Sequence, residues 1–247
     1  MKLKVTCPGE SQNPVDGLPT IKIGGRKVAA LFKWLVALVG GLLAAAVASG
    51  QWVAFNDQGW DGTNSRVTAY SLDFIRMPDR GPLINIDTGN PLGAVLRLSF
   101  AGTPATDLWA STTMGAPAPG TPAYTNFFPY ITWIDQRASG IAFTERGVIT
   151  YNFSGLDPAK RYRLVGAGIR GNTTPTPGNE YSNRWTMAEL VGAAAYTPVH
   201  SSGVITSNQF SGALTGSQAA WNAGINTRGD VIYWTRITPS ANGTLAV

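Results

Sequence analysis

Cysteine and histidine are nearly absent from this chain of 247 residues, which contains only Cys7 and His200. A single thiol cannot form a disulfide within the chain, so the fold has to be stabilised by buried apolar surface. One cysteine and one histidine cannot supply the usual ligands of a zinc site either. Disulfide-stapled and ordinary zinc-stabilised domains are therefore excluded.

Long hydrophobic runs are also missing. The longest, WLVALVGGLLAAAVA at residues 34–48, has 15 residues, whereas a membrane-spanning helix needs about 20. Lys27 and Lys33 precede it, and Ala46–Ala48 has the small-x-small pattern of a signal-peptidase site. A basic flank, a short apolar core and a small-residue exit are typical of a secretory signal. We therefore predict a polar extension and a signal helix over residues 1–48, cleaved at its end, with an uncleaved segment as the alternative.

Charge is sparse, at 13% of residues, and unevenly placed. Residues 1–48 carry six basic and two acidic side chains, so most of the chain's net charge of +5 lies there. The remaining residues 49–247 are close to neutral and lack the concentrated basic face that nucleic-acid binding requires. We expect a protein of the cell envelope or the extracellular space with no nucleic-acid partner and a membrane contact only through an uncleaved signal.

What the chain has in abundance is Gly, Thr, Ser, Asn and Pro, between short apolar runs. Many short strands bounded by turn residues indicate an all-β protein, an antiparallel β-sandwich formed by one domain over residues 49–247. Ser217–Ala223 has the composition of a single helical turn. The expected strands are 52–55, 67–74, 94–100, 130–134, 147–153, 161–170, 184–191, 203–206 and 230–237.

One segment, Ala101–Pro129, is too rich in proline for a strand to run through it. Long irregular connections in compact domains are usually functional or mobile. This one also contains aromatic residues, including Trp109 and Tyr124, which indicates that part of it packs against the domain.

A corner motif follows one predicted strand, where Gly155-Leu-Asp-Pro158 precedes Tyr162. This spacing predicts a tyrosine corner, in which the ring is buried and the hydroxyl bonds to backbone just upstream. We expect Leu156 to plug the end of the sandwich and Pro158 to stiffen the bend. The motif resembles the late strand pair of fibronectin type III domains, although 85 residues follow the tyrosine here.

The whole of residues 51–247 is more similar to secreted bacterial modules with a galactose-binding-like, jelly-roll sandwich. Besides the corner, the resemblance rests on Trp52–Asp57, Arg170, Asn183–Thr186 and Ile237–Gly243. It implies a module that is appended to a larger surface protein. A last strand would normally follow residues 243–247, so the chain is either a fragment or lacks that edge strand.

Catalytic patterns are weak. A Ser-His-Asp arrangement needs a positioned histidine base, and His200 has only Ser201 and Ser202 as sequence neighbours, with no nucleophile-elbow motif. Paired carboxylates would suit glycoside hydrolysis, but nothing in the sequence brings two of the acids together. A secreted hydrolase therefore remains an alternative to a non-catalytic protein.

Hard oxygen ligands lie close together in one turn, at Asp57, Asp61 and Asn64. Carboxylates and amide oxygens are suitable for calcium, but the spacing is not that of an EF-hand, and any turn uses the same residue types. We expect no cofactor other than a structural calcium ion at this turn.

Aromatic residues give the strongest functional hint. Apolar walls with a few placed polar groups form many ligand sites, and flat rings stack on sugar faces. Strand tryptophans are expected to fill the core, whereas aromatics and polar groups in loops are expected to face a ligand. The carbohydrate-binding candidates are Trp109, Tyr124, Arg170, Asn172, Glu180, Tyr181, Asn183 and Arg184.

These observations favour a secreted or cell-surface module that is not an enzyme and that binds a polysaccharide or other glycan. The structural alternative is a spacer or interaction module whose partners are other domains of a longer surface protein. The enzymatic alternative is a glycoside hydrolase that uses a pair of carboxylates.

Overall fold

A computed structural model describes residues 1–7, 51–57, 65–72, 78–102, 118–131, 147–168, 185–206, 214–223, 226 and 228–247. Met1–Cys7 belongs to the same folded unit as Trp52–Val247. Of the segment Pro8–Gln51 between them, only Gln51 is among the described residues.

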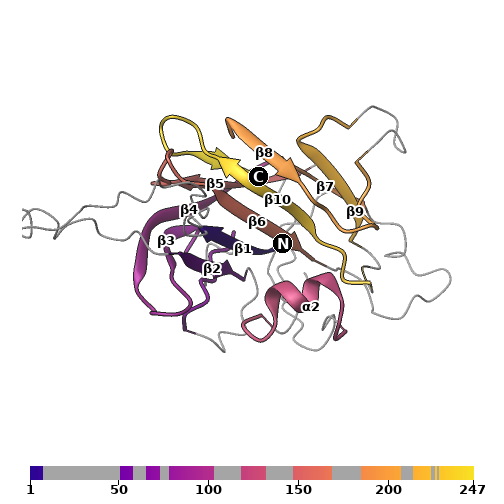
Figure 1. Cartoon of the computed structure of the whole chain (residues 1–247), viewed down its shortest axis with the longest axis horizontal. Coiled ribbons are helices and arrows are strands. Elements are labelled where there is room, and N and C mark those ends of the chain that lie inside the picture. Colours follow the sequence, from indigo (N-terminus) through magenta and orange to yellow (C-terminus); the bar gives the residue numbers. More distant parts are fainter. Residues whose placement is uncertain are drawn as a thin grey trace, which may run out of the picture. The chain divides into compact units, whose positions relative to one another are not determined.

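Two antiparallel sheets form the framework (Figure 1). The five-stranded sheet has the order β2 (Trp52–Asn56), β1 (Lys2–Cys7), β6 (Tyr162–Ala167), β10 (Ile232–Thr238) and β8 (Ala195–Pro198). The four-stranded sheet has the order β11 (Leu245–Ala246), β5 (Val148–Ser154), β4 (Pro91–Ala101) and β3 (Arg80–Ile84). A separate ribbon pairs β7 (Trp185–Glu189) with β9 (Gln218–Asn222).

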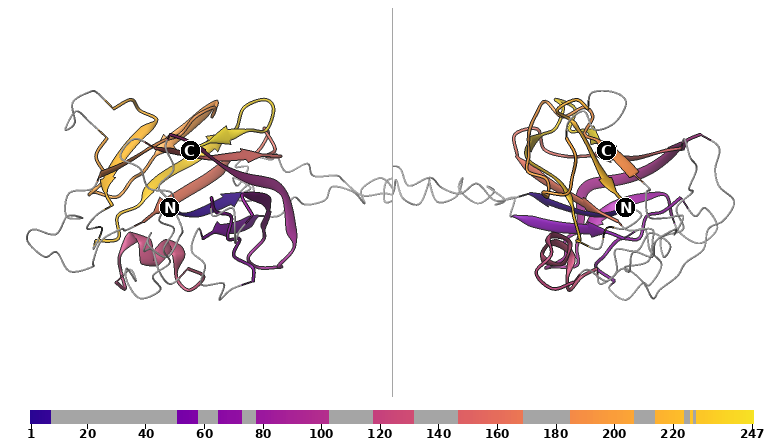
Figure 2. Two further views of the ribbon diagram at one scale, coloured as in Figure 1. Left: turned by 180° about the vertical axis from the view of Figure 1, so that it is seen from behind. Right: turned by 90° about the vertical axis from the view of Figure 1, so that its right-hand side faces the viewer.

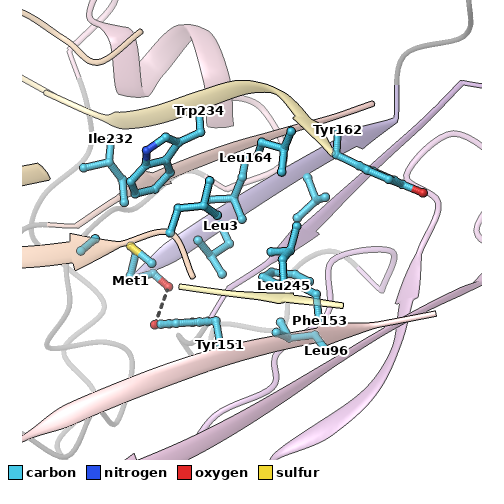
Figure 3. Packing of buried hydrophobic residues seen from close by; sticks show 14 of the residues in the cluster. Met1, Leu3, Leu96, Tyr151, Phe153, Tyr162, Leu164, Ile232, Trp234 and Leu245 are labelled. Carbon is cyan, nitrogen blue, oxygen red and sulfur yellow. Dashed lines mark hydrogen bonds between the residues drawn. The ribbon is translucent and has the colours of Figure 1, made fainter. Parts of the chain in front are cut away.

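The two larger sheets bury a common core. Leu3 and Leu164 of the five-stranded sheet belong to the same buried cluster as Leu96 and Phe153 of the four-stranded sheet. Figure 3 shows these side chains together, with Trp234 beside them. Alternate strand residues point to one face of a sheet, so each strand contributes every second side chain to this core. The expected all-β, antiparallel sandwich is confirmed at this level.

A short helix, α2 (Pro122–Phe127), lies against the other face of the five-stranded sheet (Figure 2). The Thr121 hydroxyl caps the helix by accepting a hydrogen bond from the Tyr124 N–H, and Pro122 begins its first turn. Ala123 and Phe127 are fully buried on the sheet side. The helix falls within 101–129, so the prediction of an irregular loop is wrong over this part, because the cap and Pro122 favour a helix start.

The largest departure from the sequence prediction is β1, which lies between β2 and β6. Its register pairs Cys7 with Trp52 on one side and Thr6 with Arg163 on the other. Leu3, Val5 and Cys7 are all buried, with exposures of 0%, 5% and 1%. Met1–Cys7 therefore forms an inner strand of the unit that also contains Trp52–Val247. The apolar run 34–48, with its predicted signal helix, lies outside the described residues.

The tyrosine corner is confirmed. Tyr162 is buried, and its hydroxyl accepts a hydrogen bond of 2.8 Å from the Asp157 N–H. Leu156 is also buried, and its N–H donates to the carbonyl of Gly243 at 3.0 Å. Gly243 has φ of +69°, and a Cβ there would collide with the Leu156 carbonyl oxygen, so glycine is required at this approach. The corner thus connects β5, β6 and the loop before β11.

Several other elements differ from expectation. Residues 218–222 form strand β9 rather than a helical turn, because pairing with β7 overrides the local helix propensity of the alanines. Of the strands expected at 67–74 and 203–206, the described residues 67–72 and 203–206 contain only isolated bridges, at Thr68 and Ile205. The described part of the chain contains no helix that is long and apolar enough to cross a membrane.

Candidate functional site

A stacked aromatic pair lies on the outer side of α2. The rings of Tyr124 and Phe128 have centroids 4.6 Å apart and planes only 11° from parallel. Phe128 is 47% exposed and Tyr124 is half-buried. Residues four apart lie on the same face of a helix, which explains why the two rings meet. We call Tyr124 and Phe128 the aromatic platform.

The platform is anchored from beneath. Ala123 and Phe127 are buried against the sheet, and the Ala123 N–H donates to the carbonyl of Gly229 at 2.9 Å. Gly229 has φ of +62°, and a Cβ there would lie 2.7 Å from the Thr121 hydroxyl oxygen, so the loop before β10 fits closely against the helix start. The Phe128 N–H also donates to the Tyr124 carbonyl at 3.0 Å. These contacts hold the rings in place before any ligand binds.

The same short helix also carries two polar side chains, Thr125 and Asn126. The Thr125 hydroxyl donates to the Thr121 carbonyl, and the Asn126 side-chain amide donates to the Pro122 carbonyl at 2.9 Å. The Thr125 hydroxyl oxygen and the Asn126 amide oxygen are chemically able to accept hydrogen bonds as well. The helix surface therefore combines flat rings with hydrogen-bonding groups.

Cationic side chains occupy the face of the five-stranded sheet that α2 covers in part. Lys4 of β1 places its ammonium 5.7 Å from the centre of the Phe55 ring, and Phe55 packs edge-on against Phe127. Burial, and secondarily the positive charge of Arg163, lowers the pKa of Lys4. This face thus carries positive charge next to its aromatic residues.

Most of the predicted carbohydrate ligands lie outside the described residues. Tyr124 is the one candidate of that set for which the structure gives contacts. The candidates outside the description are Trp109, Arg170, Asn172, Glu180, Tyr181, Asn183 and Arg184. Phe128 is not among the predicted carbohydrate ligands, although its spacing of four residues from Tyr124 is a readable signal.

Of the three residues expected to bind calcium, the structure describes only Asp57. Asp57 is buried, with 5% exposure, and its N–H donates to the Thr68 carbonyl at 2.7 Å. Asp61 and Asn64 lie outside the described residues. No group of three or more His, Cys, Asp or Glu side chains that could hold a metal ion occurs in the part of the chain with described positions.

His200 is held by backbone. Its Nδ1 accepts a hydrogen bond of 2.8 Å from the Tyr233 N–H, and its ring packs edge-on against Trp234 at 5.2 Å. Ser201 Oγ accepts from the Val231 N–H at 3.0 Å. Burial lowers the pKa of His200, which favours the neutral ring that this bond requires. These bonds fix strand β10 and differ from those of a nucleophile and its base.

Comparison with known proteins gives no match: no protein family, no curated protein and no solved structure corresponds to this chain. The resemblance to galactose-binding-like modules therefore has no support from a relative.

Proposed function

We propose that this protein is a secreted or cell-surface, non-catalytic module that binds carbohydrate on the aromatic platform. We also propose that its sandwich is of the galactose-binding-like, jelly-roll kind. The observation that carries the proposal is the stacked, exposed pair Tyr124 and Phe128 on an anchored helix.

The chemistry suits a sugar ring. Pyranose rings present a face of C–H groups that packs on an aromatic ring, while hydroxyls at the rim need hydrogen-bond partners. Exposed Phe128 offers apolar surface, and Thr125, the residue after Tyr124, offers a hydroxyl oxygen that can accept a hydrogen bond. Because the two rings already stack on each other, little side-chain entropy is lost on binding.

Secretion is supported by the signal-like run at 34–48 together with the near-neutral charge of residues 49–247. A glycan partner outside the cell is consistent with both features. A role as a spacer between domains would leave the exposed platform without a ligand.

The test is binding of the full chain to a panel of soluble and insoluble polysaccharides, measured by affinity electrophoresis and pull-down. Phe128→Ala and Tyr124→Ala should weaken binding at least about tenfold, because each removes stacking surface. Met187→Ala is the matched control, since Met187 on β7 is an apolar residue of similar exposure, 54% against 47% for Phe128. Equal binding by all four chains, or no binding by the folded wild-type chain, contradicts the proposal.

A further inference from the structure

Strand β1 fills a slot between two other strands. It is antiparallel to β2, with Leu3 opposite Asn56, and antiparallel to β6, with Leu3 opposite Gly166. A strand in this position bonds to both neighbours, so removing residues 1–7 would leave the facing edges of β2 and β6 unpaired. Unpaired strand edges are templates for the addition of another strand.

The inner wall of this slot selects for apolar side chains at alternate positions. Leu3, Val5 and Cys7 enter the sandwich core, where Leu3 lies beside Trp234 and Leu164 (Figure 3). The first residue also fits closely: a Cβ on Gly166 would lie 2.7 Å from the Met1 sulfur. The Tyr151 hydroxyl donates to the Met1 carbonyl at 3.5 Å.

The opposite side of β1 accepts different chemistry. Lys4 points to the face that contains Phe55, where its ammonium lies over the ring. The slot therefore distinguishes the two sides of an incoming strand, and a shift by one residue would place Lys4 in the apolar core.

The covalent connection of β1 to the rest of the domain is long. Neighbouring strands β3 and β4 are joined by the short turn Asn85–Asn90, whereas β1 and β2 are joined through Pro8–Gln51. That connection contains the predicted cleavage site after Ala48. Cleavage there would separate β1 from the chain that forms its slot.

We propose that the slot between β2 and β6 is a strand-binding site that takes residues 1–7 in cis and, where these are lost or displaced, takes the same segment from a separate copy of the chain. The bound segment lies antiparallel to both neighbours, with Leu3, Val5 and Cys7 in the core. Its recognition uses backbone pairing for affinity and the alternation of side chains for register. Processing of the N-terminal segment then determines which chain supplies the strand.

The test uses the full-length chain with the double substitution Leu3→Asp and Val5→Asp, which prevents the cis strand from entering the apolar slot. A fluorescent peptide with the sequence Met1–Cys7 is titrated under reducing conditions, and its anisotropy is measured. The variant should bind the peptide at least about tenfold more tightly than the wild-type chain, whose slot is occupied. A peptide of the same composition with the apolar residues consecutive should not bind.

If the variant does not fold alone, it is refolded from denaturant with and without the peptide. The peptide should then raise the folded fraction, read from the near-ultraviolet circular dichroism of the buried tryptophans. Absence of both binding and rescue overturns the proposal. Equal binding of the rearranged peptide, or of the wild-type chain, also overturns it, because the site would then not be the β1 slot.

Discussion

The two faces of the five-stranded sheet differ in what covers them. One face packs against a whole second sheet, with fully buried Leu96 and Trp234 in the shared core. The other packs against the six-residue helix α2, in a smaller cluster centred on Phe55 and Phe127 and bordered by partly buried residues such as Tyr130. Among the described residues, stability should therefore reside mainly in the first face, and the smaller cluster on the second face should contribute less.

Successive side chains of strand β1 point to opposite faces of the five-stranded sheet. Leu3 and Val5 enter the large core, while Lys4 lies over Phe55 on the side of the smaller cluster. Substitutions at neighbouring positions of this one strand should therefore have different consequences.

The largest effect is expected from Leu3→Ala. Removing a fully buried leucine from a packed core lowers the free energy of unfolding by about 3–4 kcal/mol. Lys4→Ala should cost less than about 1 kcal/mol, because it removes only an ammonium–ring contact and part of an apolar stem. Urea denaturation of both variants checks the difference, and equal losses would contradict an inner position for β1.

A loss of about 3 kcal/mol is expected from Phe127→Ala, at the lower end for a buried phenylalanine. The small cluster can relax around the cavity, and α2 can open without the sandwich. Native-state hydrogen exchange should show faster exchange at the Phe128 and Ile131 amides, which bond to helix carbonyls, and unchanged exchange in β5. Acceleration throughout the sandwich would contradict the separation of the two clusters.

Loss of the hydrogen bond in the tyrosine corner should lower the free energy of unfolding by about 1 kcal/mol. Tyr162→Phe keeps the buried ring but leaves the Asp157 N–H without the hydroxyl that accepts its bond. Tyr196→Phe, on the exposed strand β8, is a matched control. A free energy of unfolding equal to that of the wild-type chain would show that water replaces the hydroxyl without loss.

His200 should contribute to the pH dependence of the free energy of unfolding. Burial lowers its pKa in the folded state below 6.5, so the folded protein binds fewer protons there than the unfolded chain. The contribution of His200 to the free energy of unfolding is therefore fully present above about pH 6.5 and is lost as the pH falls below that value. Urea titrations at pH 7.5 and 5.5 should show a smaller decline for His200→Gln, and an identical decline would exclude this histidine as a source.

Much of the framework could be predicted from the sequence. The strand expected at 147–153 is β5, and the Gly-Leu-Asp-Pro spacing predicted a bond from the Tyr162 hydroxyl to upstream backbone, because both are local patterns. The strand β1 has the same alternation at Leu3, Val5 and Cys7, but the signal-like run after it led to its exclusion. Its pairing with β2 and β6 is non-local, and no local pattern specifies it.

The site was less predictable. Tyr124 was found as a loop aromatic, but its partner Phe128 depended on recognising a helix within a proline-rich segment. The anchoring of that helix by the Gly229 carbonyl joins positions far apart in the chain, which sequence spacing does not reveal.

The most direct test of an inner N-terminal strand is native-state hydrogen exchange of the full-length chain, resolved at single amides. Every interior amide of β1 faces either β2 or β6, so Leu3, Lys4, Val5 and Thr6 should exchange within about tenfold of the slow amides of β6. Exchange of these four amides at the rate of an unstructured peptide, with β6 still protected, would show that β1 is not part of the sheet.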